Sequence, residues 1–400
     1  MRNKLFLVSY MYVILFTSYS CQKNNFEQEM NEFNFIIGTQ TIGAQYKFTQ
    51  ETNLVETAKA IRNMGSNILK ISLGPQYFDE NYDIPYQNNI QSLTDLAKEK
   101  SVNQVLRMDF KYYQLWAYEF LQEPTVLPNH KNNKYAEFSS YKEIYGLTTY
   151  LLKEFTGTGK IFYLGNWEGD WHLRQDYDRT KDIDPQTIQK MIKWINMRQR
   201  AIDDAKKNTP HNNVEVYHYL EVNLSDLAIA GKSCAINSVL PHTNIDYVSF
   251  SSYTATNPPA TEEEMDSVLT AHLNYIESKI PPKKEIQGKR LFIGEYGWNE
   301  SEYSREQINE RAKWVIKTAL KWGCTYILFW EMYNNELNTD GSNRGFWLID
   351  KNNQKTPLYE THYKFYSESR EWLHQYIQKK QRMPTEKEFT KAALTFNALK

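Results

Sequence analysis

Short apolar runs of strand type alternate with stretches of helical spacing through most of the chain. A continuous apolar run of this length is typical of a strand buried on both faces of a parallel sheet. We expect strands at 33–38, 67–73, 102–109, 161–164, 214–220, 245–250 and 324–330, and the seventh in order within the stretch 291–298, where it stops at Glu295. Helical spacing predicts helices at 54–64, 90–98, 141–155, 185–207, 224–229, 262–280 and 306–322. Residues 110–139 are polar and aromatic without a clear period, which is typical of a long functional loop.

Strands that alternate with helices predict an α/β protein with a closed (β/α)8 barrel. An open doubly wound sheet alternates in the same way, but no glycine-rich nucleotide-binding turn follows the first strand. We therefore predict a single catalytic barrel domain at 33–380. It would end in a long closing helix at 358–381, followed by a short C-terminal helical extension at 381–400.

The N-terminus has the pattern of an export signal. Two basic residues precede an apolar run that is too short for a comfortable membrane span, and Cys21 follows it. The pattern resembles a bacterial lipoprotein signal, although Ser18 stands where that family usually has Leu. The resemblance implies a signal peptide at 1–20, lipidation of Cys21 and a polar tether at 21–32. The protein would then be exported and anchored to a bacterial membrane, periplasmic or at the cell surface. A plain secretory signal is the alternative.

The composition narrows the classes of partner. Lys+Arg 47 against Asp+Glu 48 gives a formal charge of -1, so no basic surface is available to attract nucleic acid or an anionic bilayer. Any membrane contact is expected only through the lipid anchor. Aromatic residues make up 14% of the chain, and flat aromatic faces in a cleft suit sugar rings. Cys234 and Cys324 have no metal-ligand spacing, so no metal or other cofactor is expected.

Carboxylates follow several of the predicted strands. Glu168 comes after the fourth strand, Glu221 after the fifth, Glu295 after the seventh and Glu331 after the eighth. Two Glu side chains on nonadjacent strands can approach each other across the mouth of a barrel. Cleavage of a glycosidic bond needs such a pair, one to protonate the leaving oxygen and one to attack the anomeric carbon or activate water.

Four features together resemble clan A, the retaining glycoside hydrolases built on a (β/α)8 barrel. They are Glu168, Glu295, Trp330 at the end of the eighth strand, and the segment 345–357 that follows it. The resemblance implies that Glu168 is the acid/base and Glu295 the nucleophile in the hydrolysis of a polysaccharide or oligosaccharide. It implies a sugar platform at Trp330 and a hydrogen bond from Tyr253 to the nucleophile. The candidate substrate-binding residues are Asn166, Trp171, Glu221, Tyr253, Trp298 and Trp330.

Two positions depart from the clan pattern. Trp167 stands between Asn166 and Glu168, whereas clan members usually have Asn directly before the acid/base. Because successive strand residues face opposite sides, this insertion changes the direction in which Asn166 points unless the strand has bulged or ended. Lys70 on the second strand stands where the clan pattern has an Arg that steadies a carboxylate.

Some alternatives stay open at this level. Asp170 could be the acid in place of Glu168, and Glu221 or Glu331 could be ordinary salt-bridge partners. His172 and His218 lie near strand ends without a ligand group around them, so structural roles are the default. A catalytically inactive barrel lipoprotein that binds glycans is the competing function, but a pure binder needs no matched acid and nucleophile.

Overall fold

The computed structural model describes residues 30, 32–78, 82–120, 133–174 and 176–400. The expected signal segment at 1–20, Cys21 and nearly all of the tether lie outside the described residues. Among the residues that are described, no helix combines the length and the apolarity needed to cross a bilayer.

Eight parallel strands close into a barrel in which each strand pairs with its neighbours in sequence order, and β1 pairs with β8. This confirms the predicted (β/α)8 architecture. The strands are β1 (Ile37–Gln40), β2 (Ile68–Leu73), β3 (Tyr112–Ala117), β4 (Ile161–Gly165), β5 (Glu215–Val222), β6 (Tyr247–Ser251), β7 (Leu291–Tyr296) and β8 (Ile327–Phe329).

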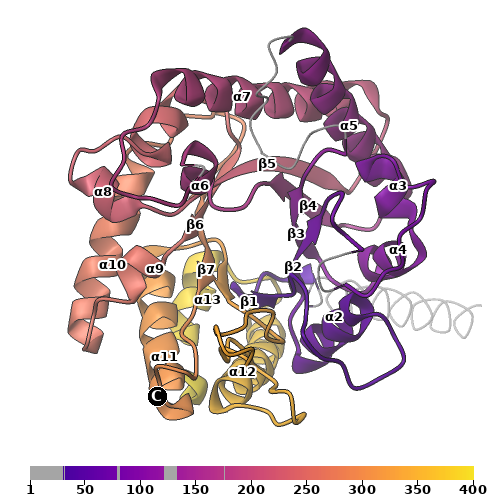
Figure 1. Cartoon of the computed structure of the whole chain (residues 1–400). Helices are drawn as coiled ribbons and strands as arrows, with labels where there is room; N and C mark the ends of the chain where they lie inside the picture. The colour runs from indigo at the N-terminus through magenta and orange to yellow at the C-terminus, as the bar shows by residue number, and fades with distance from the viewer. Residues whose placement is uncertain (1–29, 31, 79–81, 121–132, 175) are drawn as a thin grey trace, which may run out of the picture.

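Helices surround the strands in a ring, which Figure 1 shows with the barrel opening toward the viewer. The α-helices are α2 (Asn53–Met64), α3 (Leu93–Lys98), α4 (Lys100–Arg107), α5 (Asn133–Glu154), α6 (Gly169–Leu173), α7 (Pro185–Asn208), α8 (Ser225–Ile229), α9 (Tyr253–Thr256), α10 (Glu262–Glu277), α11 (Arg305–Trp322), α12 (Pro357–Lys380) and α13 (Glu386–Ala393). Short π and 3-10 turns occur at Ala235–Val239, Leu240–His242 and Asn397–Leu399.

The hydrophobic residues form two cores, as the closed sheet requires. Every residue of β7 is buried, as expected for a strand with helices on one side and the barrel interior on the other. Aromatic side chains from several strands pack together inside the barrel, including Tyr163, Tyr219, Phe292 and Tyr326. A larger cluster lies between the strands and the helices. Together these cores hold the strand ends, and the residues that follow them, at fixed positions.

The predicted third strand was wrong. Residues 102–109 do not form a strand, because Lys100–Arg107 is α4, and the third strand is Tyr112–Ala117 within the segment predicted as a loop. Val102, Val105 and Leu106 are all buried on one side of α4. Their spacing of three and four residues is that of a helix face. Aromatic residues in β3 obscured its strand character, although aromatic side chains fit a buried strand well.

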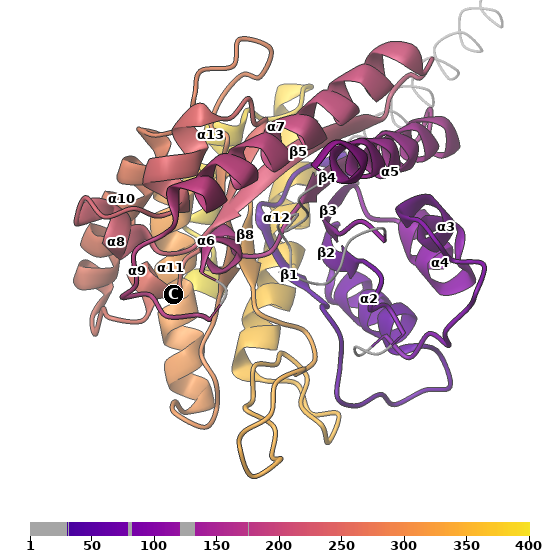
Figure 2. The same ribbon diagram turned by 45° about the horizontal axis from the view of Figure 1, so that its top comes forward.

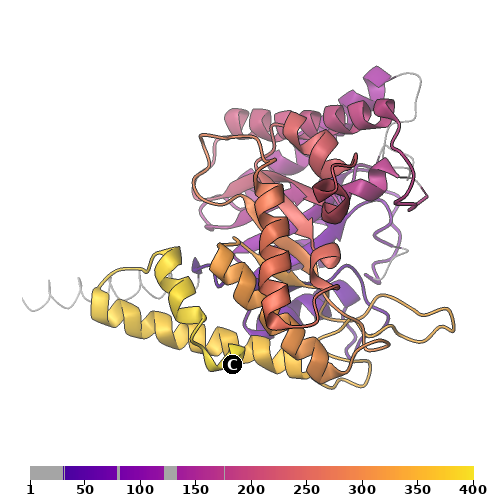
Figure 3. The same cartoon turned by 90° about the vertical axis from the view of Figure 1, so that its left-hand side faces the viewer.

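The predicted helical extension at the C-terminus is present. Figure 3 shows the yellow helices α12 and α13 running along one side of the barrel. Thr385 and Glu388 form a capping box at the start of α13. Phe389 of this helix is completely buried, and its ring meets the ring of Phe33 edge-on at 5.0 Å. The extension therefore packs against the residues that precede β1.

Candidate active site

A cavity of about 560 Å³ opens among the residues that follow the strands at the carboxyl end of the barrel. Glu168 follows β4, Tyr253 follows β6, Glu295 lies in β7 and Trp330 follows β8. The lining residues are Trp116, Trp167, Glu168, Tyr253, Asn257, Glu295, Gly297, Trp298, Asn299, Glu302, Tyr303, Trp330, Glu336, Arg344 and Phe346. The cavity therefore brings together both proposed catalytic carboxylates and several aromatic side chains.

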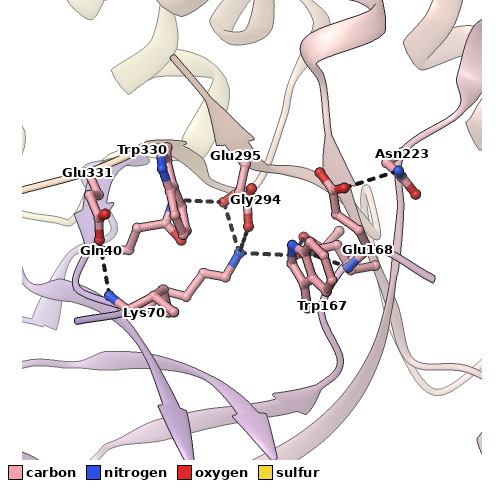
Figure 4. A network of polar contacts seen from close by, with 12 residues as sticks. Gln40, Lys70, Trp167, Glu168, Asn223, Gly294, Glu295, Trp330 and Glu331 are labelled. Carbon is pink, nitrogen blue, oxygen red and sulfur yellow. Dashed lines mark hydrogen bonds and ion pairs between the residues drawn. The ribbon is translucent and has the colours of Figure 1, made fainter. Parts of the chain in front are cut away.

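Glu295 is held by a buried ammonium group. The Nζ atom of Lys70 lies 2.9 Å from Oε1 of Glu295, and the Lys70 side chain is completely buried. The Tyr253 hydroxyl donates a longer bond of 3.4 Å to Oε2 of the same carboxylate. Figure 4 shows Lys70 reaching from its strand toward Glu295. Oε1 is thus fixed by the cation, and Oε2 is the oxygen with more freedom to react.

Lys70 also binds a second carboxylate. Its Nζ atom lies 3.0 Å from Oε2 of Glu221, which accepts a further hydrogen bond of 2.7 Å from the Ser249 hydroxyl. The third Lys70 contact is to the carbonyl oxygen of Gly294, at 3.2 Å. A Cβ atom at Gly294 would lie 1.9 Å from Oγ of Ser249, so only glycine leaves room for this arrangement. This explains one of the two glycines that flank Glu295 in the sequence.

Glu168 has a different environment. Its Oε2 accepts a hydrogen bond of 3.1 Å from Nδ2 of Asn223 and another from the Trp171 indole, and its backbone N–H donates to Glu221. Within the described part of the chain, no lysine or arginine forms an ion pair with it. Burial raises the pKa of Glu168 well above its usual range, and the nearby charges of Glu295 and Glu221 raise it further.

The two carboxyl groups differ in how strongly they hold a proton. Burial raises the pKa of Glu295, and Lys70 opposes this rise more than any other neighbour does. Lys70 contacts Glu295 directly and does not contact Glu168. The ammonium therefore favours the ionised form of Glu295, while Glu168 keeps its proton to higher pH.

Asp170 plays a structural part in the loop. Its side chain is completely buried, and its two oxygens accept backbone N–H bonds of 2.8 Å from Ala235, 3.2 Å from Leu224 and 3.4 Å from Asn223. Arg174 lies 3.4 Å away. These partners occupy the carboxylate, and the cavity lining does not include it. The geometry therefore favours Glu168 over Asp170 as the acid.

The predicted substrate-binding residues are only partly brought together. Tyr253, Trp298 and Trp330 line the cavity, whereas Asn166, Trp171 and Glu221 are not among its lining residues. Asn166 is completely buried and donates to the carbonyl of Trp167. Because β4 ends at Gly165, strand alternation no longer sets the direction of Asn166. Asn223, from the end of β5, makes the amide contact to Glu168 instead.

Aromatic rings form the walls around the carboxylates. The Trp116 ring lies 6.2 Å from the Trp330 ring and 6.4 Å from the Trp167 ring. The Lys70 ammonium lies 4.4 Å from the Trp116 ring, a cation–π contact that helps to hold the charge in place. Glu331 is buried, accepts a bond from the Ile42 backbone and is not among the residues that line the cavity.

Several site residues were missed or undervalued by sequence reasoning. Lys70 offered a usable signal, because a lysine inside a continuous apolar strand must have a buried partner. Asn223 offered a weaker one, since it follows a strand directly after Glu221. Glu336 and Arg344 lie in a loop without period, so no pattern pointed to them. The described residues also contain no group of three or more His, Cys, Asp or Glu that could hold a metal ion.

Comparison with solved structures identifies barrels of similar shape. A family 39 glycoside hydrolase from the gut symbiont Bacteroides cellulosilyticus WH2 aligns with a TM-score of 0.52 and 10% identity, over 84% of this chain and 64% of that one. A GH5_18 variant from Bifidobacterium longum, solved in complex with Manβ1-4GlcNAc, aligns with a TM-score of 0.53 and 12% identity, over 78% of this chain and 72% of that one. A family 5 xyloglucanase from Paenibacillus pabuli aligns with a TM-score of 0.52 and 14% identity, over 82% of this chain and 96% of that one.

These similarities establish the fold that the chain shares with those glycoside hydrolases. The chain spans just under two thirds of the length of the family 39 protein. No protein-family model matches the sequence, and the search of curated proteins finds no match.

Proposed function

We propose that this protein is a retaining glycoside hydrolase that cleaves a polysaccharide or oligosaccharide. The observation that carries the proposal is the unequal setting of two buried carboxyl groups in one cavity. Glu295 is paired with Lys70, and Glu168 is held only by neutral donors. A retaining mechanism needs this difference, since one group must attack as an anion while the other donates a proton.

In the first step Glu168 donates its proton to the glycosidic oxygen, and Oε2 of Glu295 attacks the anomeric carbon. The C–O bond to the leaving group breaks, the leaving group departs as an alcohol, and an ester forms between the sugar and Glu295. Glu295 loses its charge in this step. Lys70 stays paired with Glu221, so the buried ammonium never lacks a counter-ion.

In the second step the Glu168 carboxylate takes a proton from water, and the water oxygen attacks the same anomeric carbon. The ester bond breaks and Glu295 leaves as a carboxylate, which pairs again with Lys70. Two displacements at one carbon keep its configuration. Trp330, with Trp116 and Trp167 beside it, offers flat apolar surface for the sugar ring.

The structural neighbours agree with this proposal. The proteins with similar barrels are glycoside hydrolases by name, and the Bifidobacterium longum variant carries a disaccharide. The alternative is an inactive barrel that binds glycans. The ion pair between Lys70 and Glu295 argues against it, because a binding protein gains nothing from a poised nucleophile and acid.

One experiment separates the two functions. The purified exported protein is incubated with a panel of glycans, and the anomeric form of the first product is followed by NMR. Product that first appears with the configuration of the substrate supports the retaining enzyme. Binding without any product across the panel, for both the wild-type protein and Glu295→Gln, would favour the inactive binder.

We also propose that the protein is exported as a lipoprotein anchored through Cys21. The apolar run before Cys21 and the polar residues after it support a tether and not a membrane-spanning segment. Cys21→Ala should move the protein from the membrane fraction to the soluble exported fraction. Unchanged membrane association of this variant would contradict the anchor.

A further inference from the structure

A short hairpin after β8 forms one wall of the cavity. Figure 2 shows the segment between β8 and α12 projecting as a separate orange loop. Leu337 and Asn343 form an antiparallel bridge within it, and the backbone N–H of Arg344 donates to the carbonyl of Glu336 at 3.0 Å. Glu336 and Arg344 are therefore opposite each other at the base of the hairpin, and both line the cavity.

Their side chains form a chain of contacts that ends on the aromatic platform. Arg344 lies 2.5 Å from Oε2 of Glu336, and the other oxygen of Glu336 accepts a bond of 2.9 Å from the Trp330 indole. The Arg344 guanidinium lies 5.1 Å from the ring of Phe346. About a third of each charged side chain is exposed, 36% for Arg344 and 32% for Glu336. A ligand beside Trp330 can therefore reach both groups.

The base of the hairpin is held in place by Asn334. The Asn334 amide donates to the carbonyl of Glu336 at 2.6 Å and accepts from the backbone of Gly345 at 2.9 Å and of Phe346 at 3.1 Å. The backbone of Ser301 also donates to the carbonyl of Arg344, at 3.2 Å. The two charged groups are thus prearranged, which lowers the cost of binding.

The charges around this wall disfavour an anionic ligand. Glu302 also lines the cavity, together with Glu295. Among the described residues that line the cavity, Arg344 is the only basic one, and Glu336 neutralises it. Against these described residues, a sugar that carries a carboxylate or sulfate would face acidic groups without a free cation to pair with. A guanidinium and a carboxylate side by side instead offer donors and acceptors to neighbouring hydroxyl groups.

We propose that Glu336 and Arg344 form a second sugar subsite, beside the Trp330 platform, that binds the hydroxyl groups of an uncharged sugar residue. This inference rests on the proposed function, because it extends the same cavity. It assigns the substrate to the class of neutral glycans of at least two sugar units. It also makes this pair a specificity determinant distinct from the catalytic carboxylates.

Kinetics on substrates of two lengths test the subsite. An aryl monoglycoside of the accepted configuration occupies the platform alone, whereas an oligosaccharide of the same sugar also reaches the hairpin. Arg344→Ala should lower kcat/KM for the oligosaccharide at least about tenfold more than for the aryl glycoside, as expected for the loss of a charged hydrogen bond. Glu336→Gln keeps an acceptor for Trp330 and should show the same bias.

Arg382→Ala is the matched control, because Arg382 forms an exposed pair with Glu388 on the C-terminal extension. It should leave both substrates unaffected. Equal losses on both substrates in Arg344→Ala and Glu336→Gln, or no loss on either, would overturn the subsite.

Binding measured without turnover separates this inference from the proposed function. Calorimetry on Glu295→Gln with cellotriose, mannotriose and trigalacturonate should show one of the neutral sugars binding at least about tenfold tighter than the acidic one. Adding Arg344→Ala should abolish that preference by weakening the binding of the neutral sugar. Equal or tighter binding of trigalacturonate would contradict the proposed substrate class. If the wild-type protein cleaves no glycan while the preference for the neutral sugar holds, the proposed hydrolase activity is contradicted and the proposed subsite is still supported.

Discussion

The side-chain ammonium of Lys70 lies 2.9 Å from Oε1 of Glu295, and both side chains are almost completely excluded from solvent. The same ammonium lies 3.0 Å from Glu221. One cation therefore pairs with two buried carboxylates, from β5 and β7, and it does so from β2 on the other side of the barrel. Its position makes Glu295 the more readily ionised of the two proposed catalytic groups.

Replacing Lys70 should damage both stability and activity. Lys70→Met leaves Glu221 and Glu295 buried without a cation, which should lower the free energy of unfolding by roughly 3–5 kcal/mol at neutral pH. Loss of the ammonium also raises the pKa of Glu295, so the acidic limb of the pH profile of kcat/KM should move to higher pH. Chemical denaturation and pH–rate measurements check both effects.

Lys59→Met is the matched control, since Lys59 pairs with Glu51 at the surface. Exposed pairs contribute little, so this variant should behave like the wild type. If the Lys70→Met protein has wild-type stability and the acidic limb of its pH profile does not move, Lys70 does not have the proposed role in the active site.

Glu221 should set the working pH of both catalytic groups. Its charge raises the pKa of Glu295 and of Glu168, although burial is the larger cause for each. Glu221→Gln removes that charge and keeps the shape. The acidic limb, which belongs to Glu295, and the basic limb, which belongs to Glu168, should therefore both move to lower pH. A pH profile of kcat/KM whose limbs move to higher pH, or in which only one limb moves, would contradict this role of Glu221.

The acid can be identified by rescue. Glu168→Ala should lower the rate on natural glycans roughly a hundredfold to ten-thousandfold, because their leaving groups need a proton. An activated aryl glycoside should still form the ester, and added azide should partly restore turnover by attacking it. Product analysis for the glycosyl azide checks this outcome.

Asp170→Asn provides the comparison. Asp170 accepts three backbone N–H bonds, so its replacement should lower the free energy of unfolding by about 1–3 kcal/mol without any response to azide. Azide rescue of Asp170→Asn, and none for Glu168→Ala, would reverse the assignment.

The sequence predicted the barrel because most of its strands are uninterrupted apolar runs that end in turns. It placed Glu168 and Glu295 in the right region because residues at the ends of parallel strands share one end of a barrel. It failed at β3, where the apolar spacing of α4 looked like a strand and the aromatic residues of Tyr112–Ala117 looked like a loop.

Contacts that depend on closure of the barrel could not be predicted from the sequence. Lys70 and Glu221 lie on different strands, and only closure brings them to the same carboxylate network. Asn223 replaces Asn166 beside Glu168 because β4 ends one residue before Asn166. The pairing of Glu336 with Arg344 depends on a hairpin whose residues have no periodic pattern.

Labelling of the nucleophile tests the proposed mechanism most directly. A 2-fluoro aryl glycoside of the accepted configuration forms the ester quickly and loses it slowly, so the adduct can be digested and mapped by mass spectrometry. We expect one sugar per protein, attached to Glu295, and no adduct in Glu295→Gln, which should still fold and bind glycan. A label on Glu221 or Glu331, or a wild-type protein that releases the inverted anomer first, would contradict a retaining enzyme with Glu295 as its nucleophile.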